Sequence, residues 1–204
     1  MATPIQFPDE LEPNGASWEY SHNTRSFESP FTRYSQVVEG QGARWLASFE
    51  YHNLTQVQQR LIRYIETLPK GTVFSVPAHG FQYGGDDTAR NVAVAGAGQT
   101  GLQLDTTGWS INTRVLRQGD AVGIDGELKV MAADVVSNGS GEATLTFTTP
   151  MRKSPATGGV ITFAPAIIHM RRTIGDSASF GLSQGSEYSG ILTAISLGFE
   201  EAIY

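Results

Sequence analysis

Residues 142–148 read EATLTFT, so that Ala143, Leu145 and Phe147 share one face of an extended chain and threonines line the other. A period of two with one apolar face indicates a half-buried β-strand. We expect Pro150 to end this strand, because proline cannot donate a ladder hydrogen bond. The same alternation returns at 191–199 and appears earlier at 44–51. These three segments predict a chain made largely of strands.

Turn residues separate the strands from Gly108 onward. Asp125-Gly126 and Asn138-Gly139 are dipeptides typical of tight hairpins, and both lie between apolar runs. Short strands at this spacing predict a β meander that folds as a small barrel or sandwich. The predicted fold class is therefore mainly β, with one α-helix packed on it.

Residues 54–68 predict that helix. Its apolar side chains recur at helical spacing and form one face, made up of Val57, Leu61, Ile62, Ile65 and Leu68. Asn53 is the expected N-cap, with Gln56 completing a capping box. Pro69 ends the helix. Gln59 falls on the face that we expect to be polar and solvated.

The first 40 residues fit neither period, so we predict an N-terminal arm over 1–40 with a possible first strand near 32–38. A single β-rich domain over 41–204 is expected to follow. The loop 77–91 is long for a compact domain and is expected to be functional or covered on assembly. Aromatic side chains in the arm and this loop are the candidate interface residues, because aromatics bury large areas at interfaces. They are Trp18, Tyr20, Phe27, Phe31, Tyr34, Phe81 and Tyr83.

Composition argues against several classes of function. The chain has 20 acidic and 14 basic residues and a net charge of -6, without the basic patch of a nucleic-acid binder. It contains no cysteine, which excludes disulfides and thiolate chemistry. No apolar run reaches the roughly 18 residues of a membrane-spanning helix. We therefore expect no membrane anchor and no recognition of a specific nucleic-acid sequence.

A search for catalytic and cofactor-binding motifs also argues against an enzyme. The four histidines include no spaced metal-binding pair. The segment 96–101 matches the glycine spacing of a dinucleotide fingerprint, but a β segment follows where a helix is needed. Asp86 and Asp87 are interpreted as turn formers. We predict a protein that is not an enzyme and holds no cofactor or metal.

Several blocks of sequence are similar to a pattern in the distal tail proteins of siphophages and their close relatives. They are GDAVGIDG at 119–126, DVVSNGSGEATL at 134–145, TPMR at 149–152, WLASF at 45–49, LPKGTVF at 68–74 and FEEAI at 199–203. The resemblance covers roughly 44–175 well and the rest loosely. Its motifs are patterns of turns and strands rather than catalytic signatures.

The resemblance implies a homohexameric ring in the virion, assembled in the host cytoplasm. The ring would lie at the distal end of a phage tail, between the tail tube protein and the tail hub, tip or fibre proteins. A tail-tube or tube-completion ring is a related alternative. Two other classes stay open: a carbohydrate- or receptor-binding module, with Trp109 and Tyr83 as candidate contacts, and a cell-wall hydrolase at the tail tip.

Overall fold

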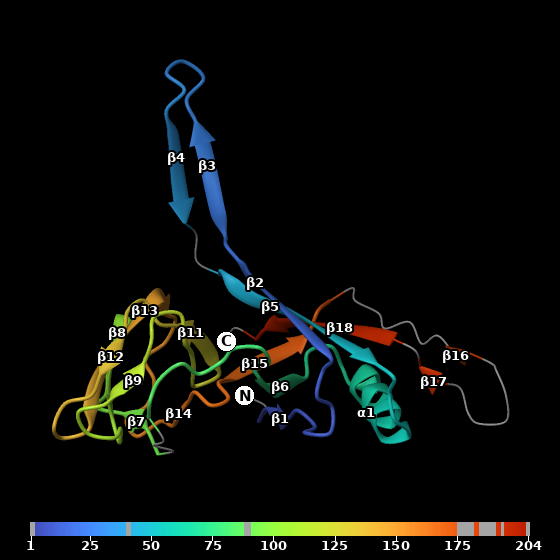
Figure 1. Ribbon diagram of the computed structural model, residues 1–204. Coiled ribbons are helices and arrows are strands. Elements are labelled where there is room, and N and C mark those ends of the chain that lie inside the picture. Colours follow the sequence, from blue (N-terminus) through green and yellow to red (C-terminus); the bar gives the residue numbers. More distant parts are fainter. Residues whose placement is uncertain are drawn as a thin grey trace. The chain divides into compact units, whose positions relative to one another are not determined.

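The computed structural model describes residues 3–39, 42–87, 91–174, 182–183, 191–192 and 194–202. Strands account for 47% of the chain, and the described residues contain a single helix (Figure 1). The predicted mainly β class with one helix is confirmed. The predicted barrel is wrong: the antiparallel sheets stay separate and none closes. Most of them have only two or three strands, too few to curl round and meet.

The chain divides into two compact units, which are described separately. The first consists of 1–74 and 170–204, and the second of 75–169. This grouping does not follow the expected boundary at residue 40. The reason lies in strand pairing: β18 (Ala194–Glu201) pairs antiparallel with β5 (Arg44–His52), which joins the end of the chain to its N-terminal region.

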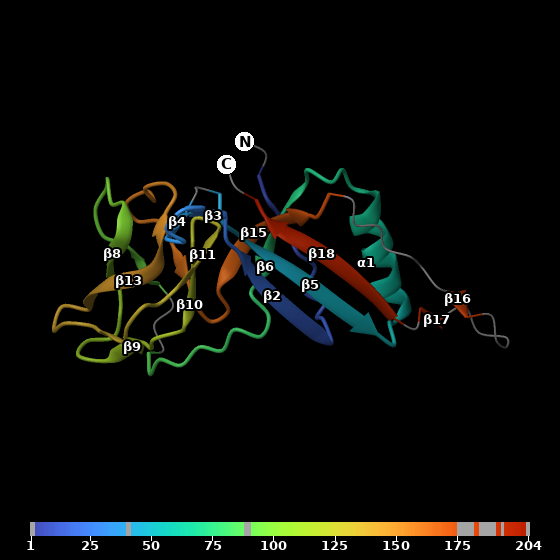
Figure 2. The same cartoon turned by 90° about the horizontal axis from the view of Figure 1, so that it is seen from above.

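The largest sheet has six strands in the order β1-β6-β15-β18-β5-β2. Its remaining bounds are β1 Ile5–Gln6, β6 Val73–Pro77, β15 Ile167–Arg172 and β2 Gly15–Ser21. Figure 2 shows β18, β5 and β2 as adjacent long strands. Phe49 on β5 lies opposite Leu197 on β18, and both side chains are fully buried, as the alternation in 44–51 and 191–199 predicts.

The core of the first unit is aromatic and includes residues from the segment predicted to be an arm. The ring of Phe7 lies 6.4 Å from Phe49, 6.2 Å from Phe74 and 5.8 Å from Phe199, each pair in edge-to-face geometry. Phe7 is only 2% exposed, and Leu11 is buried as well. Phe7 and Leu11 therefore anchor this segment in the core, where aromatic pairs of this kind stabilise packing.

Helix α1 (Gln56–Thr67) begins two residues later than the predicted helix over 54–68. Thr55 is the N-cap: its hydroxyl accepts from the Gln58 N–H at 3.3 Å, and the Gln58 side chain accepts from the Thr55 N–H at 3.0 Å. Asn53, the predicted cap, instead has a left-handed backbone with φ of 53°. The prediction of one helix is confirmed, and the predicted capping residues are wrong.

The buried face of α1 also differs from the predicted one. Ile62 and Ile65 are buried as expected, whereas Val57 is 44% exposed. Gln59 lies on the buried side, where its amide donates to the Leu54 carbonyl at 3.1 Å. A buried amide is tolerated when it is hydrogen-bonded. Within the described ranges, no helix has the length and apolar character needed to span a membrane.

The second unit contains three small sheets with the orders β11-β10-β14, β12-β9 and β13-β8-β7. The bounds are β7 Ala93–Val94, β8 Gly101–Thr107, β9 Arg114–Leu116, β10 Ala121–Ile124, β11 Glu127–Val130, β12 Val135–Val136, β13 Glu142–Met151 and β14 Ile161–Thr162. Ala143, Leu145 and Phe147 all face its core, as their alternation predicts. Asp125 and Gly126 both have positive φ between β10 and β11, which confirms the predicted hairpin turn.

Two further two-stranded sheets complete the described structure. One joins β16 (Leu182–Ser183) and β17 (Ile191–Leu192). The other is the hairpin of β3 (Thr24–Glu28) and β4 (Ser35–Glu39), and β4 is the strand expected near 32–38. Residues 184–190 and 193 lie outside the described residues, so the predicted strand over 191–199 is described only in part.

Candidate functional site

The β3–β4 hairpin is the part of the described chain that most resembles a binding surface. Phe27 on β3 lies directly opposite Gln36 on β4. The Ser29 N–H donates to the Tyr34 carbonyl at 3.0 Å, which closes the connection between the strands. Arg33, with φ of 56°, supplies the left-handed residue that this connection needs. In the described sheets, β3 and β4 pair only with each other (Figure 1).

A change of register separates this hairpin from the six-stranded sheet. The pairing of β2 with β5 ends at Ser21 and Arg44, and the pairing of β3 with β4 starts at Thr24 and Glu39. Two residues lie between the paired segments on one strand and four on the other. An unequal count of this kind interrupts the ladder and lets the strands bend. The hairpin is therefore a distinct element at the end of two sheet strands.

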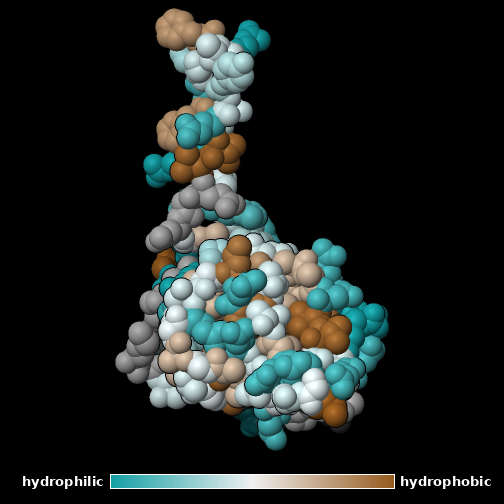
Figure 3. Space-filling view, turned by 90° about the vertical axis from the view of Figure 1, so that its left-hand side faces the viewer, coloured by the Kyte–Doolittle hydropathy of each residue, from teal (hydrophilic) through white to brown (hydrophobic). Residues whose placement is uncertain are grey.

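Apolar side chains are exposed on both faces of the hairpin. Phe27 (59% exposed) and Val38 (44%) share one face, because Val38 lies opposite Arg25, which is two residues from Phe27 on β3. Val37 (65%) lies opposite Ser26 and is on the other face. The connection adds Phe31 at 95% and Tyr34 at 80%. Figure 3 shows hydrophobic side chains along the hairpin at the top of the view. An isolated two-stranded hairpin is at best marginally stable in water, so this one gains most from a partner that covers it.

Three predicted interface residues lie on the hairpin: Phe27, Phe31 and Tyr34. The structure adds Val37 and Val38, which were not among the predicted interface residues. The available signal was two consecutive valines in one strand, because side chains on successive residues point to opposite faces and cannot both face one core. Their joint exposure marks a strand with neither valine covered by the described residues.

Trp18 and Tyr20 lie instead on β2, an edge strand of the six-stranded sheet. The Trp18 ring is 6.3 Å from Trp45 and 5.7 Å from Phe49, and the Tyr20 ring is 5.0 Å from Trp45. Both side chains are half-buried. They form an aromatic cluster within their own unit, and their contact with another subunit stays a prediction.

Phe81 and Tyr83 belong to the second unit, in the described part of the 77–91 loop. The Tyr83 hydroxyl donates to the Val115 carbonyl at 2.7 Å and accepts from the Asp87 N–H at 3.0 Å. Burial raises the pKa of Tyr83. Asp87 is buried and accepts from the Ser110 N–H at 3.2 Å and its hydroxyl at 2.5 Å. Contacts within the unit thus hold 83–87 in place.

Trp109 and Tyr83, the candidate sugar contacts, pack against other side chains of the protein. Trp109 is 4% exposed, its indole N–H donates to the Thr106 hydroxyl at 2.7 Å, and its ring lies 5.1 Å from Phe163. Tyr83 packs on the same Phe163 ring, also at 5.1 Å. Stacking on a sugar requires an exposed aromatic face, and Trp109 does not offer one.

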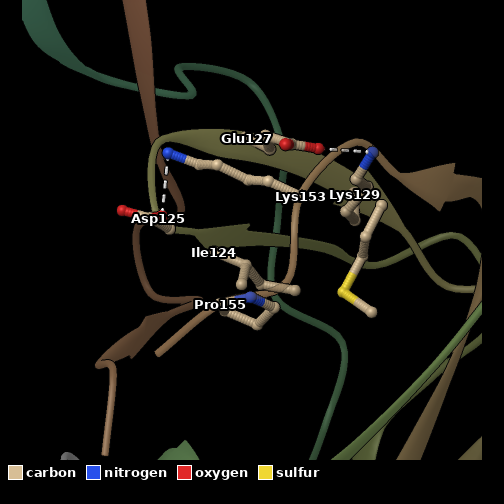
Figure 4. A pocket seen from close by; sticks show the side chains of 7 residues that line it. Ile124, Asp125, Glu127, Lys129, Lys153 and Pro155 are labelled. Carbon is tan, nitrogen blue, oxygen red and sulfur yellow. Dashed lines mark ion pairs between the residues drawn. The ribbon is translucent and has the colours of Figure 1, made fainter. Parts of the chain in front are cut away.

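A small cavity beside the β10–β11 hairpin is lined by charged residues (Figure 4). Lys129, 3% exposed, donates to the Glu127 carboxylate and to the Pro150 carbonyl, each at 2.8 Å. Lys153 pairs with Asp125 at 2.9 Å. The cavity holds about 10 Å³, about the space of one water molecule, which is too small for an organic ligand. We therefore interpret these ion pairs and this hydrogen bond as structural contacts between strands and loops.

The described residues contain no group of three or more histidine, aspartate or glutamate side chains placed to hold a metal ion. Asp86, beside the buried Asp87, pairs with Arg114 at 3.0 Å and Arg117 at 3.3 Å. No family model and no curated protein matches the chain. The exposed apolar side chains of the β3–β4 hairpin are therefore the main structural indication of function.

Proposed function

We propose that the chain is a structural subunit of a bacteriophage tail. It forms a closed homohexameric ring at the distal end and joins the tail tube protein to the tail hub, tip or fibre proteins. It acts without a catalytic step or a cofactor, as part of a virion built in the host cytoplasm. The observation that carries the proposal is the β3–β4 hairpin, which exposes apolar side chains on both faces.

A two-sided hairpin suits a ring. In a heterologous ring each subunit presents one surface to a different surface of the next, and the rotation closes after a fixed number of copies. A hairpin inserted between neighbours would lose both exposed faces to contact with protein. Burial of Phe31, Tyr34 and the two valines would then drive assembly, at roughly 25 cal/mol for each Å² of apolar surface removed from water.

The resemblance to distal tail proteins supports the same function. Its block at 119–126 forms β10 and the turn after it, and the block at 134–145 forms β12 and the start of β13. These segments build the scaffold of the second unit rather than a site. A protein whose resemblance lies in its scaffold, and whose exposed apolar surface lies on a hairpin, fits a structural role.

Native mass measured over a concentration series tests the ring. A species near six times the 22.0 kDa chain mass is expected for the intact protein. The informative variant replaces 22–43 with Asn-Gly, which forms a tight turn between the paired residues Ser21 on β2 and Arg44 on β5. Deleting all of 1–40 would be uninformative, because it removes Phe7 and Leu11 from the core.

The shortened variant is expected to stay monomeric while its thermal unfolding midpoint matches that of the intact chain. A matched control keeps the full hairpin and changes the exposed Thr24 to Ser. If the shortened variant assembles as well as the control, the hairpin does not carry assembly. Antibody labelling of intact virions tests location: label at the distal tail end is expected, and label on the head or none at all would contradict the proposal.

A further inference from the structure

A groove of about 690 Å³ runs along β13 in the second unit. Residues of β8 and β12 line it as well, among them Asp105 on β8 and Val136 on β12. Its volume falls in the range of about 300–1,000 Å³ that is usual for ligand sites. None of the seven predicted interface residues lines it.

The groove carries negative charge that the unit does not neutralise. Its three carboxylates are held by neutral donors: Asp105 by the Thr144 hydroxyl at 2.6 Å, Glu142 by the Asn138 amide at 2.9 Å, and Asp134 by the Gln118 N–H at 2.8 Å. Across the described ranges none of the three forms an ion pair, whereas Asp86, Asp125 and Glu127 in the same unit all do. A concave acidic surface attracts a partner with positive charge.

The groove also offers apolar surface and strand edges. Val136 is 63% exposed. Among the described sheets, β13 pairs with β8 and β12 pairs with β9, so the two strands that border the groove are not paired with each other. Unpaired strand edges present backbone donors and acceptors to an incoming peptide. The occupant that fits is an extended peptide segment with cationic and apolar side chains.

We propose that this occupant is the β3–β4 hairpin of a second copy of the chain. The hairpin has no net charge, since Glu28 and Glu39 balance Arg25 and Arg33. Both arginines are exposed, and neither forms an ion pair within the part of the chain that the structure describes, so their positive charge is available to the groove. Phe31 at its tip supplies an apolar contact for Val136. The inference rests on the proposed ring and names the surface that receives the hairpin. Hairpin and groove are different surfaces, as a heterologous ring requires.

Disulfide crosslinking tests this pairing cleanly because the chain has no cysteine of its own. A Thr32→Cys variant, at the hairpin tip, is mixed with a differently tagged Val136→Cys variant under mild oxidation. The matched control is Val160→Cys, a valine of the same unit that is 65% exposed and does not line the groove. Docking raises the local thiol concentration, so we expect about tenfold more heterodimer with Val136→Cys than with Val160→Cys.

Charge reversal gives a second readout. Glu142→Lys in the Val136→Cys chain is expected to reduce the crosslink, and Arg33→Glu in the Thr32→Cys chain to restore it. Glu12→Lys, an exposed acid of the first unit, is the control and should have no effect.

Equal or absent crosslinking at the two valines would overturn the inference. Native mass of the same samples separates this failure from that of the ring. If an oligomer forms without the Val136 crosslink, the proposed ring is retained and the groove is rejected as the surface that receives the hairpin. A monomer without the crosslink rejects both self-assembly and the docking of the hairpin.

Discussion

Removing the Glu66 carboxylate should destabilise the first unit more than removing its partner Arg172. The two side chains form a buried ion pair between α1 and β15, with 2.6 Å between the Arg172 nitrogen and the Glu66 oxygen. Arg172 is 1% exposed and Glu66 14%. The guanidinium also lies 5.3 Å from the centre of the Phe199 ring. Glu66→Ala therefore removes a carboxylate that pairs with a guanidinium deep in the aromatic core.

The expected cost follows from that burial. Breaking a buried pair by removing one partner typically costs about 3–5 kcal/mol. A carboxylate in the last turn of a helix opposes the helix dipole, so its removal returns about 0.3–1 kcal/mol. We expect a net loss near 3 kcal/mol for Glu66→Ala. Arg172→Met should cost only about 1 kcal/mol, because Glu66 is less deeply buried and keeps Lys70 at 3.6 Å.

Hydrogen exchange of β5 and β18 amides, measured in a urea series, reports the first unit separately from the second. The double variant Glu66→Leu with Arg172→Met is the control and should lie close to the intact protein, because an apolar pair replaces both charges. A loss below about 1 kcal/mol for Glu66→Ala, or a larger loss for Arg172→Met, would refute the reasoning.

Three further predictions concern the second unit. Trp109→Phe loses the indole hydrogen bond to Thr106 and should cost about 1–3 kcal/mol in urea unfolding, and an unchanged midpoint would contradict it. Gly126→Ala forces a side chain onto a residue with φ of 84° and into the His169 ring, so it should cost at least about 1–3 kcal/mol, whereas the control Gly119→Ala meets open space and should cost less. Burial lowers the pKa of His169 below its usual value, with Asp125 opposing the shift and Lys153 adding to it. Its stabilising contribution is therefore complete above the unfolded-state pKa and falls as pH drops through the folded-state pKa. His169→Gln should flatten that part of the curve of thermal midpoint against pH, and an unaltered curve would exclude His169 as its source.

The candidate site was predictable in part. Aromatic residues without a period, such as Phe27 and Phe31, marked the hairpin as a surface, because side chains that fit no core pattern have no obvious place in one. The same reasoning misplaced Phe7, which lies in the core, and overestimated Trp109 as a contact for sugars. Whether an aromatic ring is exposed depends on residues far along the chain that cover it, and a local pattern does not contain them.

Local patterns determined the elements of this protein. Alternation in 142–148, the Asp125-Gly126 turn and the proline after α1 each act over a few neighbouring residues, so the sequence alone predicts them. Only the tertiary structure decided which strands pair and which side chains are buried. Strand pairing joined β18 to β5 and divided the described strands into separate open sheets, and the packing of α1 buried Gln59 in place of Val57. Burial and strand order arise from contacts between distant segments, which the local period of a sequence does not specify.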